Sequence, residues 1–153
     1  MIRIGKLTDY AMLIMSHMAK NPLSLLSATE LADALHLTVP TVSKILKMLA
    51  EAGMVTSTRG AEGGYLLAKA ANNITVADVI AAMEGDLAMT ECCESIGLCT
   101  IDSMCALREN WRKINSMIHA MLSKVTILNM MAPDFSGKLN AISTKMQALQ
   151  NDK

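Results

Sequence analysis

The stretch SATELADALHLTVPTVSKILKMLAEAG, residues 27–53, has the punctuation of two short helices joined by a tight turn. Ser27 and Glu30 have the spacing of a capping box, in which each side chain satisfies a free amide at the start of a helix. Thr38 can cap the second helix, and Pro40 falls in its first turn, where a missing N–H does no harm. The stretch therefore predicts a helix-turn-helix pair, with the first helix running from residue 28 to about 35.

A glycine-tipped hairpin is predicted directly after this pair. Gly53 is suited to the left-handed backbone that ends many helices. It is followed by two β-prone runs, MVTST (54–58) and YLL (65–67), on either side of the turn sequence RGAEGG (59–64). Two such runs around a glycine-containing turn are typical of a two-stranded hairpin.

Two further helices are predicted around this unit. The first begins at Thr8 or Asp9, either of which can cap it, and runs to about Lys20, ahead of Asn21-Pro22. The second is capped by Thr75, covers residues 76–84 and is closed by a glycine. Helix, helix, turn, helix and hairpin form the order of a winged helix-turn-helix, so we expect a mainly α fold with this domain over residues 1–85.

This domain order favours DNA binding, because the second helix of such a pair lies in the major groove. Hydroxyl groups near its start can contact bases or phosphates, and lysines can neutralise phosphates. The alternative is a protein-contact module whose polar residues are ordinary surface. The predicted DNA contacts are Arg3, Lys6, Pro40, Thr41, Ser43, Lys44, Lys47 and Arg59.

An apolar seam in the second half predicts a long helix over residues 106–130. Its members recur at alternating intervals of four and three residues, the a/d pattern of a coiled coil. A helix of this length cannot bury its whole stripe on so small a domain, so we expect a homodimer; the alternative is a helix folded back on its own domain. A weakly amphipathic tail covers residues 131–153. The seam consists of Leu107, Trp111, Ile114, Ile118, Met121, Val125 and Leu128.

Composition supports an aliphatic globular protein. Of 153 residues, 52% are hydrophobic, with only four aromatic residues against fourteen methionines. The net charge is zero, but residues 1–69 carry seven Lys/Arg and five Asp/Glu, residues 70–110 one and seven, and residues 111–153 six and two. No uncharged run approaches the ~20 residues of a membrane span. We therefore expect a cytoplasmic protein without a membrane partner, in which thiols stay reduced.

Four cysteines gather in the acidic segment over residues 86–105: Cys92, Cys93, Cys99 and Cys105. Zinc sites usually contain close pairs such as C-x2-C, which are absent here. His119 lies about three helical turns beyond the last cysteine, too far to join easily. Thiolates on an open loop favour an iron–sulfur cluster with a further ligand from elsewhere. The alternative is a set of inert reduced thiols.

The sequence resembles a known family at several places. LTDYA (7–11), RGAEGGYLL (59–67), VADVI (76–80) and the cysteine loop are similar to the IscR/NsrR-type bacterial repressors. TEC (90–92) and RENWRKIN (108–115) look most like the branch that regulates the SUF cluster-assembly operon. The resemblance implies a dimer formed by the long helix, a cluster held by the cysteine loop, and Arg59 in the minor groove.

Two positions depart from this pattern. IscR members have a histidine ligand where this chain has Arg108, which cannot bind a metal. NsrR-like members can use an aspartate of the first helix, and Asp9 stands at that place, where it is either a ligand or only a helix cap. Which of Cys92 and Cys93 is the first ligand stays open, as does the choice between 2Fe–2S and 4Fe–4S.

The sequence thus predicts a repressor that binds double-stranded operator DNA and senses iron–sulfur cluster status, and the resemblance implies that it controls SUF or ISC assembly genes. The alternatives are a nitric-oxide or thiol-redox sensor of the same fold and, much less favoured, a small electron carrier. The sequence contains no nucleophile–base pair, phosphate loop or HExxH motif, so neither an enzyme nor a small-molecule substrate is expected.

Overall fold

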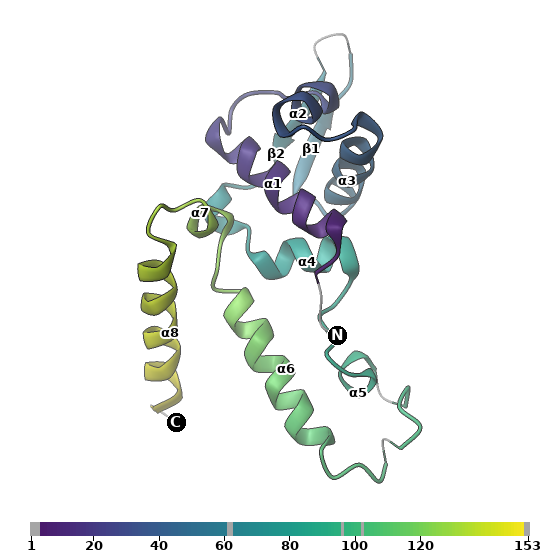
Figure 1. Ribbon diagram of the computed structural model, residues 1–153, viewed down its shortest axis with the longest axis vertical. Coiled ribbons are helices and arrows are strands. Elements are labelled where there is room, and N and C mark those ends of the chain that lie inside the picture. Colours follow the sequence, from purple (N-terminus) through teal and green to yellow (C-terminus); the bar gives the residue numbers. More distant parts are fainter. Residues whose placement is uncertain (1–3, 61–62, 96, 102, 152–153) are drawn as a thin grey trace.

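The computed structural model describes residues 4–60, 63–95, 97–101 and 103–151, with side chains through Lys145. It is mainly helical with a small two-stranded wing, which confirms the predicted fold class (Figure 1). Within these residues, no helix is both long and apolar enough to cross a bilayer. The elements are α1 (Lys6–Lys20), α2 (Ala28–Leu35), α3 (Val39–Glu51), β1 (Val55–Thr58), β2 (Gly64–Leu67), the 3-10 helix η1 (Ala71–Asn73), α4 (Val76–Glu84), α5 (Glu91–Glu94), α6 (Arg108–Leu122), α7 (Ile127–Met130) and α8 (Phe135–Asn151).

The start of α2 has the predicted capping box. The Glu30 amide donates to Ser27 Oγ at 3.2 Å, and the Ser27 amide donates to the Glu30 carboxylate at 2.7 Å. The hydrogen bond from the Ser27 amide, followed by the Ser27 hydroxyl, holds the pKa of the Glu30 carboxyl below its usual value. Thr38 occupies the N-cap of α3 but caps no amide, because its hydroxyl is paired with that of Thr41.

The start of α1 differs from the prediction. The helix begins at Lys6 with Gly5 as its N-cap, so neither Thr8 nor Asp9 is a cap. The Thr8 side chain is buried, and its hydroxyl donates to the Glu84 carboxylate at the end of α4. The same carboxylate oxygen accepts from the Gly5 amide at 2.7 Å. Glu84 therefore ties the start of α1 to the point where the cysteine segment leaves α4.

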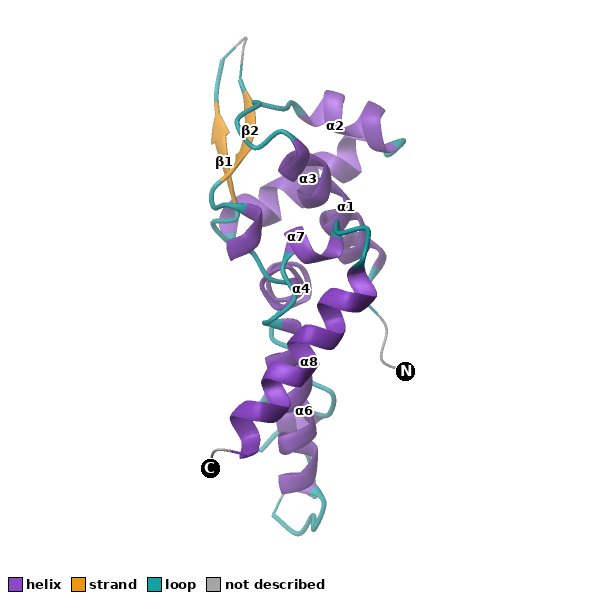
Figure 2. Cartoon of the chain, turned by 90° about the vertical axis from the view of Figure 1, so that its left-hand side faces the viewer, coloured by secondary structure: helices purple, strands orange, loops and turns teal. Residues whose placement is uncertain are grey.

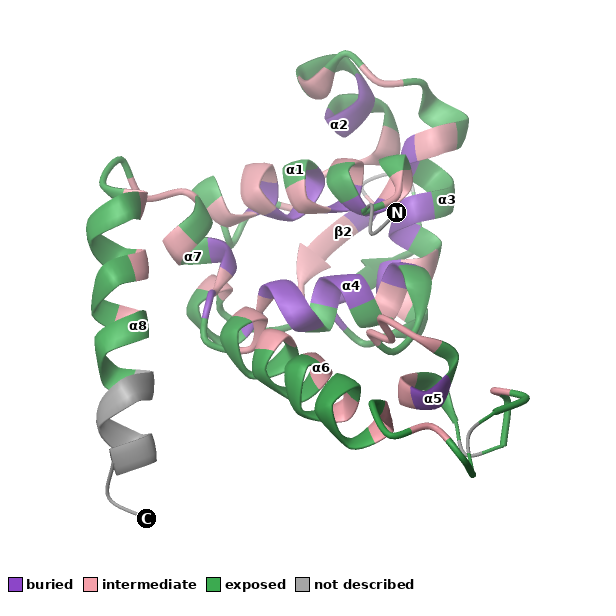
Figure 3. Cartoon of the chain, turned by 60° about the horizontal axis from the view of Figure 1, so that its bottom comes forward, coloured by how far each residue is buried: buried purple, intermediate pink, exposed green. Residues whose placement is uncertain are grey.

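The core lies between α1, α3 and α4, with one face of each helix buried (Figure 3). The side chains spaced three and four residues apart on α3 all point inward, as the sequence pattern predicts. β1 and β2 pair antiparallel, with Val55 opposite Leu67 and Thr58 opposite Gly64. The main buried members are Ala11, Ile14, Met15, Met18, Leu31, Val42, Ile45, Leu46, Leu49, Val79 and Ile127.

The long helix predicted over residues 106–130 is wrong in its last third. α6 ends at Leu122, and the chain then returns to the first domain, where the Val76 amide donates to the Val125 carbonyl at 2.8 Å. Thr126 caps the separate α7 with a capping box. The Val125 side chain is only 4% exposed, against Val76 and Ile80 of its own chain. The predicted seam residue Val125 is therefore a core residue.

The tail that follows is helical. α8 runs from Phe135 to Asn151 and packs its first turns against the same small cluster through Phe135, Leu139 and Ile142. Beyond that contact it extends away from the rest of the chain (Figures 1 and 2).

Replacing Ser27 by Ala is expected to destabilise the protein by about 1 kcal/mol, the usual cost of losing an N-cap hydroxyl. Urea denaturation would measure this as a lower midpoint with an unchanged slope. Thr29→Ala is the matched control, since Thr29 is an exposed residue in the same turn. Equal midpoints for the two variants would contradict a stabilising cap.

Candidate DNA-binding surface and cysteine segment

The outward face of α3 carries the predicted DNA contacts. Pro40, Ser43, Lys44 and Lys47 are exposed and Thr41 is half-buried, while the opposite face of α3 is fully buried in the core. Lys47 also lies 3.9 Å from the Glu51 carboxylate, in an exposed pair that contributes little to stability. The fold thus presents a row of hydroxyls and amines on one rigid helix.

Two residues at the start of α3, Thr38 and Val39, are not among the DNA contacts predicted from the sequence but lie beside them. Thr38 is exposed, and Val39 leaves an apolar side chain 40% exposed at the first helical position. The amino-terminal end of a recognition helix is the part that reaches base edges. A branched apolar side chain here is suited to contact a thymine methyl group. In the sequence, Val39 could have been recognised by its position directly before Pro40, which lies in the first turn of the predicted helix.

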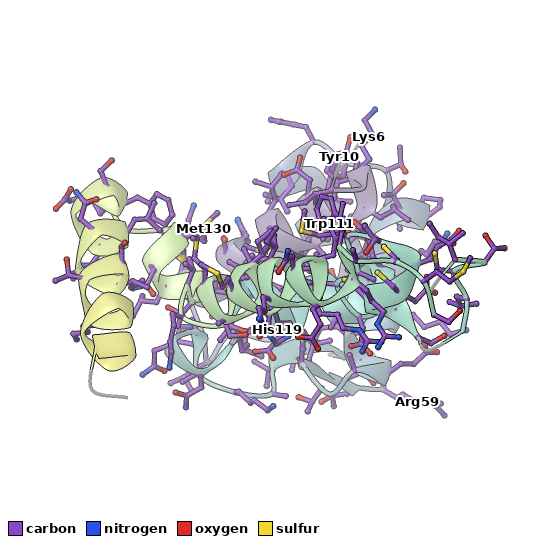
Figure 4. The ribbon with its side chains drawn as sticks, turned by 90° about the horizontal axis from the view of Figure 1, so that it is seen from below. Lys6, Tyr10, Arg59, Trp111, His119 and Met130 are labelled. Carbon is purple, nitrogen blue, oxygen red and sulfur yellow. The ribbon has the colours of Figure 1, made fainter. Side chains whose placement is uncertain are left out.

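The wing places Arg59 at an edge of the molecule. Arg59 is exposed directly after β1, and Figure 4 shows its side chain pointing outward. Lys6 is exposed at the start of α1 and projects from the opposite edge of the same view, so it does not join Arg59 in one patch. Arg3, the remaining predicted contact, lies outside the described residues.

The cysteine segment lies at the opposite end of the molecule from the wing (Figures 1 and 2). Cys92 and Cys93 belong to α5, whereas Cys99 and Cys105 lie in the loop that leads to α6. Cys92 is buried and the other three are half-buried. Among the described residues, no three His, Cys, Asp or Glu side chains are gathered so that they could hold a metal ion.

Helix α6 holds the first part of this segment through two polar side chains. The Asn115 amide group donates to the Leu87 carbonyl at 2.9 Å, and its oxygen accepts from the Met89 amide at 3.0 Å. Arg112 Nε donates to the Cys92 carbonyl at 3.1 Å. Both residues fall in the motif that carries the family resemblance, but sequence reasoning gave them no role.

His119 lies closer to the cysteines than its sequence position predicts. It lines an open hollow of about 420 Å³ between α5 and α6, together with Cys92, Cys93 and Arg112. Helix α6 runs back toward the start of the cysteine segment. His119 is therefore near Cys92 and Cys93, although it lies several helical turns beyond Cys105 in the sequence.

Asp9 is an exposed carboxylate in the first turn of α1. Since the helix is capped at Gly5, the interpretation of Asp9 as only a cap is wrong. Its role as a ligand stays a prediction.

A different face of α6 carries an apolar stripe. Trp111, Ile114, Met117 and Met121 are each at least 36% exposed, and α6 has no buried residue at all (Figure 3). Arg112 and Asn115, which hold the cysteine segment, lie on another side of the helix. Each follows a residue of the stripe by one position, which is a rotation of about 100° around the helix axis. One helix therefore serves both the cysteine segment and an uncovered apolar surface.

Comparison with known proteins places these features in a family. The Rrf2 family model, described as an iron-dependent transcriptional regulator, matches residues 4–133. The protein rrf2 of Nitratidesulfovibrio vulgaris is 33% identical over 125 residues, which cover 82% of this chain and 79% of that protein.

Two solved structures are similar over most of their length. The global cysteine regulator CymR of B. subtilis superposes with a TM-score of 0.67 at 27% identity, covering 85% of this chain and 96% of CymR. T. potens IscR superposes with a TM-score of 0.64 at 25% identity, covering 85% of this chain and 86% of IscR.

Proposed function

Because the chain belongs to the Rrf2 family of transcriptional regulators, we propose that it is a cytoplasmic repressor that senses iron–sulfur cluster status and controls SUF or ISC assembly genes. The observation that supports this most is the pairing of two separate features on one chain. A polar recognition helix with an arginine-bearing wing lies at one end, and four cysteines in one segment lie at the other.

The DNA-binding part of the proposal follows from α3 and the wing. The start of α3 enters the major groove, where Thr41 and Ser43 contact bases or phosphates and Lys44 neutralises phosphate charge. Arg59 enters the adjacent minor groove. Operators of this type are read by two copies of a protein, so the proposal includes a homodimer formed through the apolar stripe of α6.

The donor set of the cysteine segment fits an iron–sulfur cluster. None of its four cysteines forms a disulfide, three are partly accessible, and all lie within residues 92–105. Cys93, Cys99 and Cys105 would hold the cluster, with Asp9 supplied by the other subunit as a candidate fourth ligand. When bound, the cluster would supply a group that oxidants or iron shortage destroy, and the segment that would hold it joins α4 to α6.

Purification without oxygen tests the cluster directly. We expect a brown protein whose visible absorption bands disappear on exposure to air, with iron and sulfide present in equal amounts. Operator binding should then differ between the cluster-loaded and cluster-free protein at the same salt concentration. A colourless protein, or identical affinities for the two forms, would refute the sensor proposal while leaving the DNA-binding assignment standing.

Arg59→Ala is expected to weaken operator binding by roughly 1–3 kcal/mol and to relax sequence preference, because the side chain reads a groove. Lys44→Ala should instead weaken binding to all DNA sequences and reduce the salt slope by about 1, as expected for one lost phosphate contact. Fluorescence anisotropy across a salt series on operator and unrelated DNA would measure both effects. Lys138→Ala on α8 is the control, an exposed lysine far from α3. Wild-type affinity for Arg59→Ala would remove the wing from the mechanism.

A further inference from the structure

A hollow of about 310 Å³ lies at the base of the wing, between the carboxyl end of α3, the start of β1, the segment after β2 and one side of α4. Helix α3 contacts both β1 and α4 (Figure 1). Sites for small molecules begin at about this size, roughly 300 Å³. The residues that line this wing-base hollow are Ala52, Met54, Lys69, Asn73, Ile74, Asp78, Ala81 and Ala82.

The floor of the wing-base hollow is apolar and is held by backbone hydrogen bonds. Met54 is 7% exposed and Ile74 is 1% exposed. The Met54 amide donates to the Leu49 carbonyl, and the Met54 carbonyl accepts from the Ala68 amide, both at 2.9 Å. The Ile74 carbonyl accepts from the Ile127 amide at 2.9 Å. The floor therefore joins α3, the wing and α7, and its shape is set by the fold.

Three alanines leave the space above this floor open. Ala52 follows the last residue of α3, and Ala81 and Ala82 are neighbours on α4. A larger side chain at any of these positions would occupy volume that a methyl group leaves free. The space is thus suited to a compact aliphatic group, which would gain free energy by leaving water for an apolar surface.

The rim of the hollow carries two opposite charges that are not paired with each other. Lys69 and Asp78 both line it, but in the part of the chain that the structure describes Lys69 makes no ion pair. One oxygen of the Asp78 carboxylate accepts from the Thr75 amide at 2.8 Å, which leaves its second oxygen for another donor. Two unpaired opposite charges on one small hollow are complementary to a ligand that carries both charges.

Two further groups distinguish the ends of such a ligand. The Asn73 side chain, which makes no hydrogen bond to another described residue, can donate to a carboxylate together with Lys69. Ala52 is the C-cap of α3, and the carboxyl end of a helix carries a partial negative charge that favours a cation. An ammonium group is therefore favoured by Asp78 and by the end of α3.

We propose that the wing-base hollow binds a small aliphatic α-amino acid in its zwitterionic form. The carboxylate binds Lys69 and Asn73, and the ammonium group binds the free oxygen of Asp78. The aliphatic side chain lies on Met54 and Ile74. A bound amino acid links the end of the recognition helix to the base of the wing and to α4, so it changes how well the two DNA contacts fit one duplex. This last effect rests on the proposed function, whereas the binding itself does not.

Calorimetric titration of the cluster-free protein without DNA tests the binding, with L-alanine, L-valine, L-leucine and L-methionine as separate probes. We expect at least one of them to bind with a Kd of about 1 mM or tighter. Its decarboxylated amine and its deaminated acid, which are isobutylamine and isovalerate for L-valine, should each bind at least about tenfold more weakly, the effect of one hydrogen bond to a charged group. No binding of any amino acid, or equal binding of the amine and the acid, would overturn the proposal.

Two charge variants test which end binds where. Lys69→Gln should weaken binding of the amino acid at least about tenfold and leave the affinity for the amine unchanged. Asp78→Asn keeps an acceptor for the Thr75 amide, and it should weaken the amino acid by a similar factor while leaving the affinity for the acid unchanged. Lys138→Gln on α8 is the control for a lost surface charge. Wild-type affinity in both rim variants would place the ligand elsewhere and contradict the proposed site.

A filled hollow gives the third test. Ala81→Leu occupies the space from an exposed position, so the chain should fold and lose amino-acid binding. Ala141→Leu, at an exposed alanine of α8, is the matched control and should bind as the wild type does. Full binding by Ala81→Leu would overturn the proposal.

Operator titration with and without a saturating amino acid measures the coupling. We expect the operator affinity to change at least about fivefold, and the change to be absent in Ala81→Leu. Identical operator affinities would overturn the coupling. If an amino acid binds but no operator does, the proposed function fails and the site stands; if the operator binds and no amino acid does, the site fails and the function stands.

Discussion

Alanine at Cys99 or Cys105 is expected to give a colourless protein that is folded and has the same oligomeric state as the wild type. Both thiols lie in the loop outside the core, so their loss removes a ligand without opening a cavity. The measurement is the visible absorption and iron content after purification without oxygen, together with the thermal unfolding midpoint. We expect cluster occupancy to fall to background while the midpoint of the cluster-free protein stays within the range of a surface substitution.

Cys92→Ala provides the contrast within the same segment. It removes a buried thiol that is not a proposed ligand, so the variant should still bind a cluster. Full cluster occupancy in all single alanine variants of Cys93, Cys99 and Cys105 would show that the cysteines do not form the site.

A glutamate at Ile114 or Met121 is expected to convert the protein to a monomer and to weaken operator binding by at least about 100-fold. The two side chains belong to the exposed stripe of α6, and a charge buried between two such helices would lack a partner. The monomer should stay folded because α6 contributes no buried residue to its own domain. Losing the link between two DNA-reading units removes an avidity that typically amounts to roughly 10²–10⁴.

Sedimentation equilibrium and operator titration would measure these two effects. Ala120→Glu is the matched control, an exposed residue of α6 that lies beside the stripe. If Ile114→Glu remains a dimer with unchanged affinity, the stripe is not the dimer contact and another partner must cover it.

Short-range signals in the sequence determined most of the winged helix. The Ser27 and Thr75 capping boxes involve residues three positions apart, and the backbone at Gly53 needs only a glycine's freedom. The two strands are separated by a short glycine-containing turn. Each of these choices is made by neighbours in the chain, so the sequence predicts them without knowing the rest of the fold.

The same reasoning fails where the deciding partner is distant in sequence. Thr8 looks like a helix cap until the fold brings Glu84, 76 residues away, to its hydroxyl. The apolar period continues through Val125, and no local feature shows that this residue turns back onto Val76 instead of onto a second chain. Periodicity shows that apolar side chains share one face of a helix, but it does not show what covers that face.

The cysteine segment shows both what the sequence determines and what it leaves to the tertiary structure. The sequence by itself determined that four thiols lie close together in one acidic loop, since spacing and composition need no fold. The distinction between Cys92 and Cys93 was decided only by the tertiary structure. Cys92 is buried and Cys93 half-buried, and the segment is held by Asn115 and Arg112 of α6, which bind the backbone at Leu87, Met89 and Cys92 from at least twenty residues along the chain. Adjacent identical residues have the same local chemistry, so only their three-dimensional surroundings can give them different roles.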